Sequence, residues 1–243
     1  MGQAMCDAVR AEDGLELAAR FDRPGLGGEG LVRLEDALAR ADVVIDFTTP
    51  DASADLAAQA AARGVALVVG STGLGEAHLA AIAEASRRIA IVRAGNLSLG
   101  VNMLLGFVRQ AARALPAEAY DIEVFEAHHR RKIDAPSGTA LMLGAAAAEA
   151  REIRLNEASE RGRGHALGGI TGARVRGAIG FASLRGGTVA GDHSAIFAGE
   201  DERIVLSHVA ENRSIFARGA VRAGLWLIGQ PPGRYSMAEV LGH

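Results

Sequence analysis

Two adjacent histidines, His128 and His129, stand in the segment EAHHRRKIDAPSGTA, which covers residues 126–140. Two arginines and Lys132 follow them directly. Histidine is the side chain whose charge changes near neutral pH, so it can give or take a proton beside a bound molecule. A hydrated basic loop has the same composition, and the run of cations alone does not separate these two interpretations.

The residues after this run favour a helix start. Ser137 is a good N-cap, and the alanine-rich stretch behind it has a high helix propensity. The first turn of a helix leaves N–H groups without partners, and Gly138 lets an anion approach the backbone closely. With Lys132 and the arginines a few residues upstream, this pattern predicts a site for a carboxylate or phosphate. Catalysis is therefore favoured over a solvated loop.

The two histidines are expected to have different tasks. Residues 120–128 have the pattern of a strand, in which successive side chains point to opposite faces. Glu126 and His128 then share one face, while His129 points to the other. A metal ion shared by both histidines is disfavoured, and the pair of Glu126 and His128 lacks a third ligand nearby. We predict no metal site.

The first half of the chain predicts an α/β scaffold. Four short runs are continuously apolar, as expected for strands buried on both faces, and alanine-rich helical segments separate them. The expected strands are 15–20, 41–48, 65–70 and 89–94, and the expected helices between them are 51–64 and 75–88. Repeated strand–helix–strand units of this length predict a Rossmann-like, doubly wound parallel sheet.

The second half of the chain has a different pattern of helices and strands, which predicts a separate α+β domain. Helices are expected at 101–115, 137–153 and 214–229, with a short one near SMAEVLGH, and strands at 120–128, 178–185, 188–198 and 202–210. Strands that succeed one another without helices predict a mixed, open sheet. We place the α/β domain at 1–98 and 212–243, and the inserted domain at 99–211.

Candidate cofactor-binding residues lie in loops after the expected strands, where open α/β sheets bind ligands. The strand at 15–20 is followed by Asp22, which could hold an adenosine ribose, and Arg23, which could hold a 2′-phosphate. The loops GST at 70–72 and AGNL at 94–97 follow two further strands. Each could be an ordinary turn or surface ion pair. Three such loops in one sheet favour a dinucleotide cleft.

Composition excludes several classes of protein. The chain has 243 residues and a net charge of −3, which argues against a general nucleic-acid binder. Its single cysteine, Cys6, cannot form an intramolecular disulfide. No apolar run reaches the roughly 18 residues that a membrane span needs, and the N-terminus does not have the pattern of a signal peptide. We expect a cytoplasmic protein that does not bind membranes.

The segment EAHHRRKIDAPSGTA resembles, almost residue for residue, the signature of the 4-hydroxy-tetrahydrodipicolinate (dihydrodipicolinate) reductase family. The resemblance covers essentially the whole chain. Further blocks are similar to that family's and stand in its order: VVIDFTTPDAS, VVGSTGL, IVRAGNLSLGVNML, AIGFASLRGGTVAGDHSAIFA and NRSIFARGAVRAGLWL. It implies a homotetramer in which 1–98 with 212–243 binds a dinucleotide, and 99–211 binds substrate and forms the tetramer.

The resemblance also implies an activity and a set of site residues. Hydride would pass from NADH or NADPH to a cyclic, imine-containing dicarboxylic acid, with loss of water, on the diaminopimelate route to lysine. His128 would be the proton donor and acceptor, and Lys132 a second proton donor. The implied ligands of the substrate carboxylates are His129, Ser137, Gly138 and Thr139. The implied cofactor ligands are Asp22 (ribose), Arg23 (2′-phosphate), and Gly70, Ser71, Thr72, Ala94, Gly95, Asn96 and Leu97 (nicotinamide side).

The chain departs from the family at its start. Members begin with a strand and a turn of the form GxxGRMG, whereas this chain starts at Met1-Gly2, the tail of that turn, with MGQAMCDAVRA as the helix. We favour a misplaced start. The alternative is a cofactor-deficient protein that binds a dicarboxylate or serves in assembly. Aspartate-semialdehyde or homoserine-type dehydrogenases and a hydrolase rank lower, because their signatures are not found.

Overall fold

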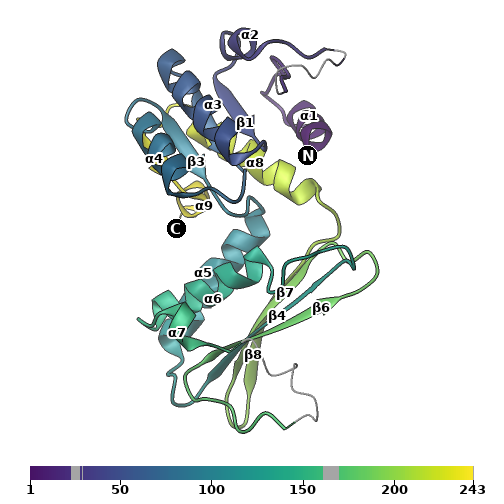
Figure 1. Cartoon of the computed structure of the whole chain (residues 1–243), viewed down its shortest axis with the longest axis vertical. Helices are drawn as coiled ribbons and strands as arrows, with labels where there is room; N and C mark the ends of the chain where they lie inside the picture. Colours follow the sequence, from purple (N-terminus) through teal and green to yellow (C-terminus); the bar gives the residue numbers. More distant parts are fainter. Residues whose placement is uncertain (23–27, 29, 161–169, 243) are drawn as a thin grey trace. The chain divides into compact units, whose positions relative to one another are not determined.

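The computed structural model describes residues 1–22, 28, 30–160 and 170–242. The chain divides into two compact units (Figure 1). Unit 1 consists of Met1–Leu99 and Ser214–His243, and unit 2 of Gly100–Arg213. Each unit has its own sheet and its own hydrophobic core, so the two are described separately.

Unit 1 contains a four-stranded parallel sheet with helices on both faces (Figure 1). Its strands, in the order in which they pair, are β1 (Val43–Asp46), β2 (Ala66–Val69), β3 (Ala90–Arg93) and β9 (Gly233–Tyr235). One face packs against α2 (Leu34–Leu38), α3 (Pro50–Arg63) and α4 (Glu76–Ala85); the other packs against α1 (Gly2–Arg10), α8 (Ser214–Leu227) and α9 (Met237–Leu241). This confirms the doubly wound parallel sheet.

The sequence explains why these elements form where they do. Leu67, Val68 and Val69 are each 0% exposed, because helices cover both faces of β2. The helix α3 carries a proline in its first turn, where a missing N–H costs nothing, and it ends at Gly64, whose φ of 72° suits a residue without a side chain.

The prediction of a strand at 15–20 was wrong. Residues 15–22 have no regular structure, and the Arg20 carbonyl accepts a hydrogen bond from the Val32 N–H. A strand forms only where a neighbour completes its ladder of backbone hydrogen bonds. No described strand lies beside this segment, since β1 pairs only with β2. The apolar run alone could not reveal that.

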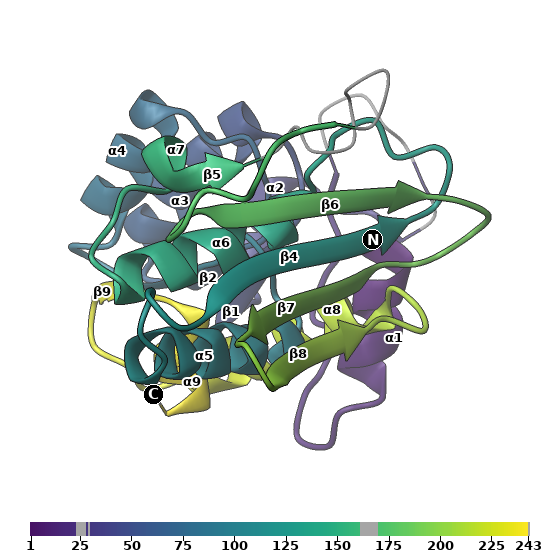
Figure 2. The same cartoon turned by 90° about the horizontal axis from the view of Figure 1, so that it is seen from below.

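Unit 2 is a five-stranded mixed sheet covered on one face by helices (Figure 2). In pairing order, its strands are β5 (Ser159–Glu160), β6 (Ile179–Arg185), β4 (Asp121–His128), β7 (Asp192–Ala198) and β8 (Arg203–Val209). Its helices are α5 (Leu99–Ala114), α6 (Gly138–Ala150) and α7 (Leu155–Ala158). β4 runs parallel to β6 and antiparallel to β7, which confirms the mixed sheet. Ile122, Leu143 and Phe197, each 0% exposed, form the centre of its core.

Small elements escaped the sequence analysis. The strand β9, the two-residue β5 and the short helices α2 and α7 were not predicted. The strand expected at 188–198 starts only at Asp192, because Gly191 before it has a φ of 150°. Elements of two to five residues carry too little periodicity to stand out from their surroundings.

Candidate active site

The end of β4 lies between two strands that place ionisable side chains beside it. Glu126 is opposite His193 on β7, and His128 is opposite Arg185 on β6. The alternation predicted for β4 holds, because Ile122, Glu126 and His128 are buried on the same face. The sheet therefore gathers a carboxylate, two histidines and a guanidinium within unit 2.

Glu126 is the centre of this group. It is 0% exposed, and Arg185 donates two hydrogen bonds to it, Nη2 to Oε1 at 2.6 Å and Nη1 to Oε2 at 2.8 Å. Burial by itself raises the pKa of Glu126. Hydrogen bonds from Arg185, Ser183 and His128 outweigh that effect and lower the pKa from 4.5 to about 2. Glu126 is therefore an anion at neutral pH, held by a bidentate ion pair with Arg185.

Glu126 also fixes the orientation of His128. The His128 Nδ1 lies 2.5 Å from Glu126 Oε2, and a carboxylate can only accept, so Nδ1 is the donor. The other ring nitrogen, Nε2, faces Gly191, where an added Cβ would stand 3.1 Å away. Nε2 is thus the nitrogen left for proton exchange, and Gly191 keeps the space beside it open.

Ser137 links this carboxylate to the start of α6. Its backbone N–H donates to Glu126 Oε1 at 3.2 Å, and its Oγ accepts from the Ala140 N–H at 3.2 Å as the predicted N-cap. Its Oγ also lies 3.0 Å from His193 Nε2. Among the described residues the Gly138 N–H has no acceptor. The first turn of α6 therefore presents a free donor to an anion.

His193 is a buried neutral base. It is 4% exposed, and burial first, then the neighbouring His128, lower its pKa from 6.5 to about 4. Its ring stands edge-on to that of His128, with centroids 5.0 Å apart. An imidazole with so low a pKa keeps one fixed state at neutral pH. Its part in the cluster is to hold Ser137.

The loop between β4 and α6 carries Lys132, whose Nζ lies 2.8 Å from Asp134 Oδ1. This hydrogen bond is the main cause of the lowered pKa of Asp134. Arg185 Nη2 donates to the Asp134 carbonyl at 2.6 Å, so the guanidinium that holds Glu126 also holds this loop. Half-buried His129 follows β4 directly, and its Nδ1 has no partner in the described part of the chain; Thr139 is half-buried in α6.

The predicted cofactor ligands lie in unit 1. Asp22 is exposed in the irregular segment after residue 20, and Arg23 is outside the described residues. Gly70, Ser71 and Thr72 follow β2, whereas Ala94, Gly95, Asn96 and Leu97 follow β3. The sheet brings the last two loops together at its carboxyl edge, because β2 and β3 are parallel neighbours. Asp22 is not on a strand that joins this edge.

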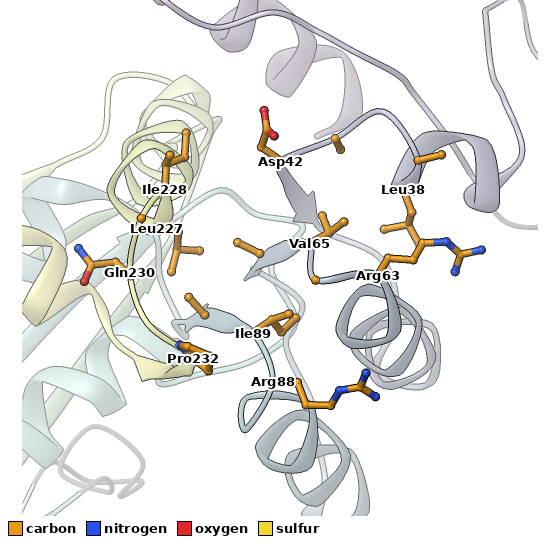
Figure 3. A pocket seen from close by; sticks show the side chains of 16 residues that line it. Leu38, Asp42, Arg63, Val65, Arg88, Ile89, Leu227, Ile228, Gln230 and Pro232 are labelled. Atoms are coloured by element: carbon orange, nitrogen blue, oxygen red, sulfur yellow. The ribbon is translucent and has the colours of Figure 1, made fainter.

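A hollow of about 790 Å³ opens at the opposite edge of the same sheet (Figure 3). Val65, Ile89 and Leu227 line it, and the guanidinium groups of Arg63 and Arg88 lie at its margin. Residues at the starts of β1, β2 and β3 form this lining together with the end of α8 and the segment after it, so the hollow belongs to the amino ends of the strands. None of the predicted site residues lines it, and doubly wound sheets bind nucleotides at the other edge.

Three residues of the site were not predicted as site residues: Glu126, Arg185 and His193. Arg185 and His193 both lie within the predicted strands 178–185 and 188–198, and an ionisable side chain inside such a strand is the signal that could have found them. Glu126 stood beside His128 in the predicted face pairing, but only as a rejected metal ligand. In the described residues, no group of three or more His, Cys, Asp or Glu side chains is arranged to hold a metal. No described helix is long and apolar enough to cross a bilayer.

Comparison with known proteins agrees with this architecture. Two family models match, "Dihydrodipicolinate reductase, N-terminus" over residues 1–97 and "Dihydrodipicolinate reductase, C-terminus" over residues 100–241. The solved structure of a dipicolinate-bound dihydrodipicolinate reductase from Paenisporosarcina sp. TG-14 superimposes with a TM-score of 0.78 at 24% identity, covering 98% of this chain and 94% of that one. At that identity the likeness supports the fold alone.

Curated relatives are closer in sequence. The 4-hydroxy-tetrahydrodipicolinate reductase of Caulobacter vibrioides is 59% identical over 243 residues, which cover 100% of this chain and 93% of the relative. That of Chelativorans sp. is 50% identical over 258 aligned residues, covering 100% and 92%. The chain, matched by both models and by these relatives along its length, belongs to the dihydrodipicolinate reductase family.

Proposed function

We propose that the chain reduces 4-hydroxy-tetrahydrodipicolinate to tetrahydrodipicolinate, with loss of water, using NADH or NADPH, in diaminopimelate and lysine biosynthesis. The observation that carries the proposal is the buried carboxylate of Glu126, which touches both the proton-exchanging His128 and the helix start at Ser137. High identity to named reductases over the whole chain favours this activity over a binding protein without cofactor.

In this proposal His128 and Lys132 carry the proton chemistry. Glu126 holds the Nδ1–H of His128, so that Nε2 exchanges the proton with the substrate. The anion of Glu126 also stabilises the imidazolium that forms when Nε2 takes a proton up. Lys132 is a second donor, oriented by its 2.8 Å contact with Asp134. A ring nitrogen that becomes negative as electrons arrive is stabilised by such donors.

The carboxylates of the substrate are assigned to the start of α6. Ser137, Gly138 and Thr139 form its first turn, and His129 lies just beyond β4. The positive end of a helix dipole and an unused N–H group favour a carboxylate there. Because Glu126 accepts the Ser137 N–H, the anion site and the proton site are held by the same side chain.

The cofactor residues form part of the same proposal. The nicotinamide, when bound, supplies the hydride. Gly2, at the start of α1, and Gly95, after β3, are both exposed, so the backbone is open to a ligand at these two places. The loops at 70–72 and 94–97 would hold the nicotinamide side. Asp22 would hold the ribose and Arg23 a 2′-phosphate.

The activity is tested by the loss of NADH or NADPH absorbance in the presence of substrate, with wild type and His128→Gln. We expect His128→Gln to lower kcat by about 100-fold or more, the usual contribution of a positioned acid or base. Fluorescence titration should give the same NADH affinity for both proteins, because His128 lies in unit 2 and the predicted cofactor residues lie in unit 1.

The matched control is His78→Gln, which removes a histidine on α4 that contacts Asp51 at 2.8 Å. Its kcat should stay at the wild-type value. Equal losses of kcat and of NADH affinity in His128→Gln would assign His128 a structural role. A wild-type chain without turnover on this substrate would refute the proposed activity.

We also expect the chain to form a homotetramer through unit 2. The face of its sheet opposite the helices carries exposed apolar side chains: Leu184 is 47%, Val205 50% and Val209 65% exposed. Exposed apolar patches on a sheet usually mark a protein interface. Light scattering should give four times the chain mass for wild type and a smaller mass for Val205→Lys; a wild-type monomer would contradict the expectation.

A further inference from the structure

A second buried polar cluster lies in unit 1, at the carboxyl end of β1. Its centre is Asp46, the last residue of β1, which is 1% exposed. Ser53 on α3 is 0% exposed, and Ser71 in the loop after β2 is 6% exposed. Buried polar side chains are costly unless each is hydrogen-bonded, so the cluster is a built feature rather than an accident of packing.

In this cluster the hydroxyl groups donate and the carboxylate of Asp46 is the final acceptor. Asp46 Oδ1 accepts from the Thr48 N–H at 3.0 Å and from the Thr48 hydroxyl at 2.6 Å, and Asp46 Oδ2 accepts from the Ser53 hydroxyl. The Ser53 and Ser71 oxygens lie 2.7 Å apart. A hydroxyl carries one proton, and that of Ser53 goes to Asp46, so Ser71 donates to Ser53.

The hydrogen bonds from Ser71 to Ser53 and from Ser53 to Asp46, which we call the Asp46 relay, join the loops at the carboxyl edge of the sheet. Asp46 fixes the loop after β1 through Thr48, and it reaches the loop after β2 through the two serines. The Gly70 N–H adds a 2.8 Å bond to the Asp46 carbonyl. Packing acts in the same direction, because a Cβ on Gly70 would lie 2.7 Å from the Phe47 ring and 2.9 Å from Leu97.

The arrangement changes the role expected of Ser71. Its hydroxyl points inward and gives its proton to Ser53, and the residue is 6% exposed, whereas the next residue, Thr72, is exposed. A ligand at this edge would therefore contact the backbone of the loop or Thr72, in the position that the buried serine sets. The side chain of Ser71 holds the loop in place through its hydrogen bond with buried Ser53.

We propose that Asp46, acting through Ser53 and Ser71, is a positioning residue that holds the loop at 70–72 in the shape that binds the dinucleotide cofactor. This inference rests on the proposed function, since only a dinucleotide-dependent reductase needs that loop as a binding surface. None of the three side chains takes part in the chemistry. Removing the relay should loosen the loop and weaken cofactor binding while leaving the catalytic step intact.

The test uses the whole 243-residue chain and its variants Ser53→Ala and Ser71→Ala, with Ser86→Ala as the control. Ser86 is also 6% exposed in unit 1 and donates to the Ala83 carbonyl at 2.7 Å, but it follows α4 and precedes β3 at the opposite edge. NADH affinity is measured by fluorescence titration, kcat and KM by turnover, and the amide exchange of residues 70–72 by mass spectrometry.

Both relay variants should raise the Kd and the KM for NADH about tenfold and speed amide exchange at 70–72. In Ser53→Ala, which changes no predicted ligand of the cofactor, kcat at saturating NADH should stay nearly unchanged. Ser86→Ala should lose comparable thermal stability but keep the wild-type Kd. Unchanged Kd and exchange in both relay variants would overturn the inference, as would equal Kd losses in the control. A wild-type chain that binds neither NADH nor NADPH would instead overturn the proposed function itself.

Discussion

The clusters around Glu126 in unit 2 and Asp46 in unit 1 are built on the same plan. Each has a buried carboxyl group near the carboxyl end of a strand, and each connects to the next helix through a serine. Ser137 is the N-cap of α6, and Ser53 lies in the first turn of α3. In both places a carboxyl group near the end of a strand accepts hydrogen bonds from the chain that follows, and it thereby orders the loop where a ligand is expected.

The two clusters differ in how the carboxyl group is balanced. Glu126 is paired with Arg185, whereas Asp46 has no ion pair in the described part of the chain and is bonded by two hydroxyls and one N–H. Neutral donors suffice where a group has only to hold position. Glu126 stands beside His128, for which we propose a change of charge during turnover, and there a fixed counter-charge keeps the carboxylate ionised.

This comparison predicts a large difference between two matched amide substitutions. Glu126→Gln takes the negative partner away from the half-buried guanidinium of Arg185, and breaking a buried ion pair costs up to about 3–5 kcal/mol. Asp46→Asn strands no charge, and the loss of acceptors for hydroxyl donors costs about 1–3 kcal/mol. Urea unfolding of both variants beside wild type measures the two free energies.

The same pair of variants should separate in kinetics. Glu126→Gln should lower kcat, because His128 loses the acceptor of its Nδ1–H, while Asp46→Asn should mainly raise the KM for NADH. If Glu126→Gln does not fold, Glu126→Asp keeps the charge at a shorter reach and serves instead. Equal unfolding costs and equal kinetic losses in the two variants would show that the ion pair makes no difference.

The two clusters were not equally readable from the sequence. The segment EAHHRRKIDAPSGTA contains Glu126, His128 and Ser137, so strand alternation placed Glu126 and His128 on one face and helix capping marked Ser137 as the start of the next helix. Arg185 stands 59 residues beyond Glu126. It reaches Glu126 only because β4 pairs with β6. The register between strands so far apart in the chain cannot be predicted from the local sequence of either strand.

The hydrogen bonds of the Asp46 relay could not be predicted from the sequence either, because they too depend on residues that are brought together only by the fold. The strands β1 to β3 were found because runs such as VALVV are continuously apolar, and apolar content is a local property. Whether a serine in a loop points outward to a ligand or inward to another serine depends on packing. Ser71 was predicted to contact the cofactor from its place in a loop after a strand and from the family resemblance, and its inward direction follows from α3, which carries Ser53.

The smallest of the expected effects is a loss of stability in acid. It separates the two clusters, because no histidine in the described part of the chain is bonded to the Asp46 cluster. Burial lowers the pKa of His193 to about 4, from 6.5. The folded state therefore favours the neutral ring, and the stability that depends on it is complete above pH 6.5. It is lost as the pH falls toward 4, by about 2 kcal/mol near pH 5.

Urea unfolding near pH 7 and near pH 5 checks this for wild type and His193→Gln. Glutamine does not titrate, and its amide can donate to the Ser137 hydroxyl or accept from it, so the variant should lose about 2 kcal/mol less than wild type between the two pH values. His208, whose pKa burial also lowers, is present in both proteins, so its own titration contributes to the losses of both. Glu126 titrates in a lower range, below pH 4.5, because its pKa is about 2. Parallel losses in the two proteins would mean that His193 is not the acid-sensitive group, and that the Ser137 end of the cluster is held by Glu126 alone.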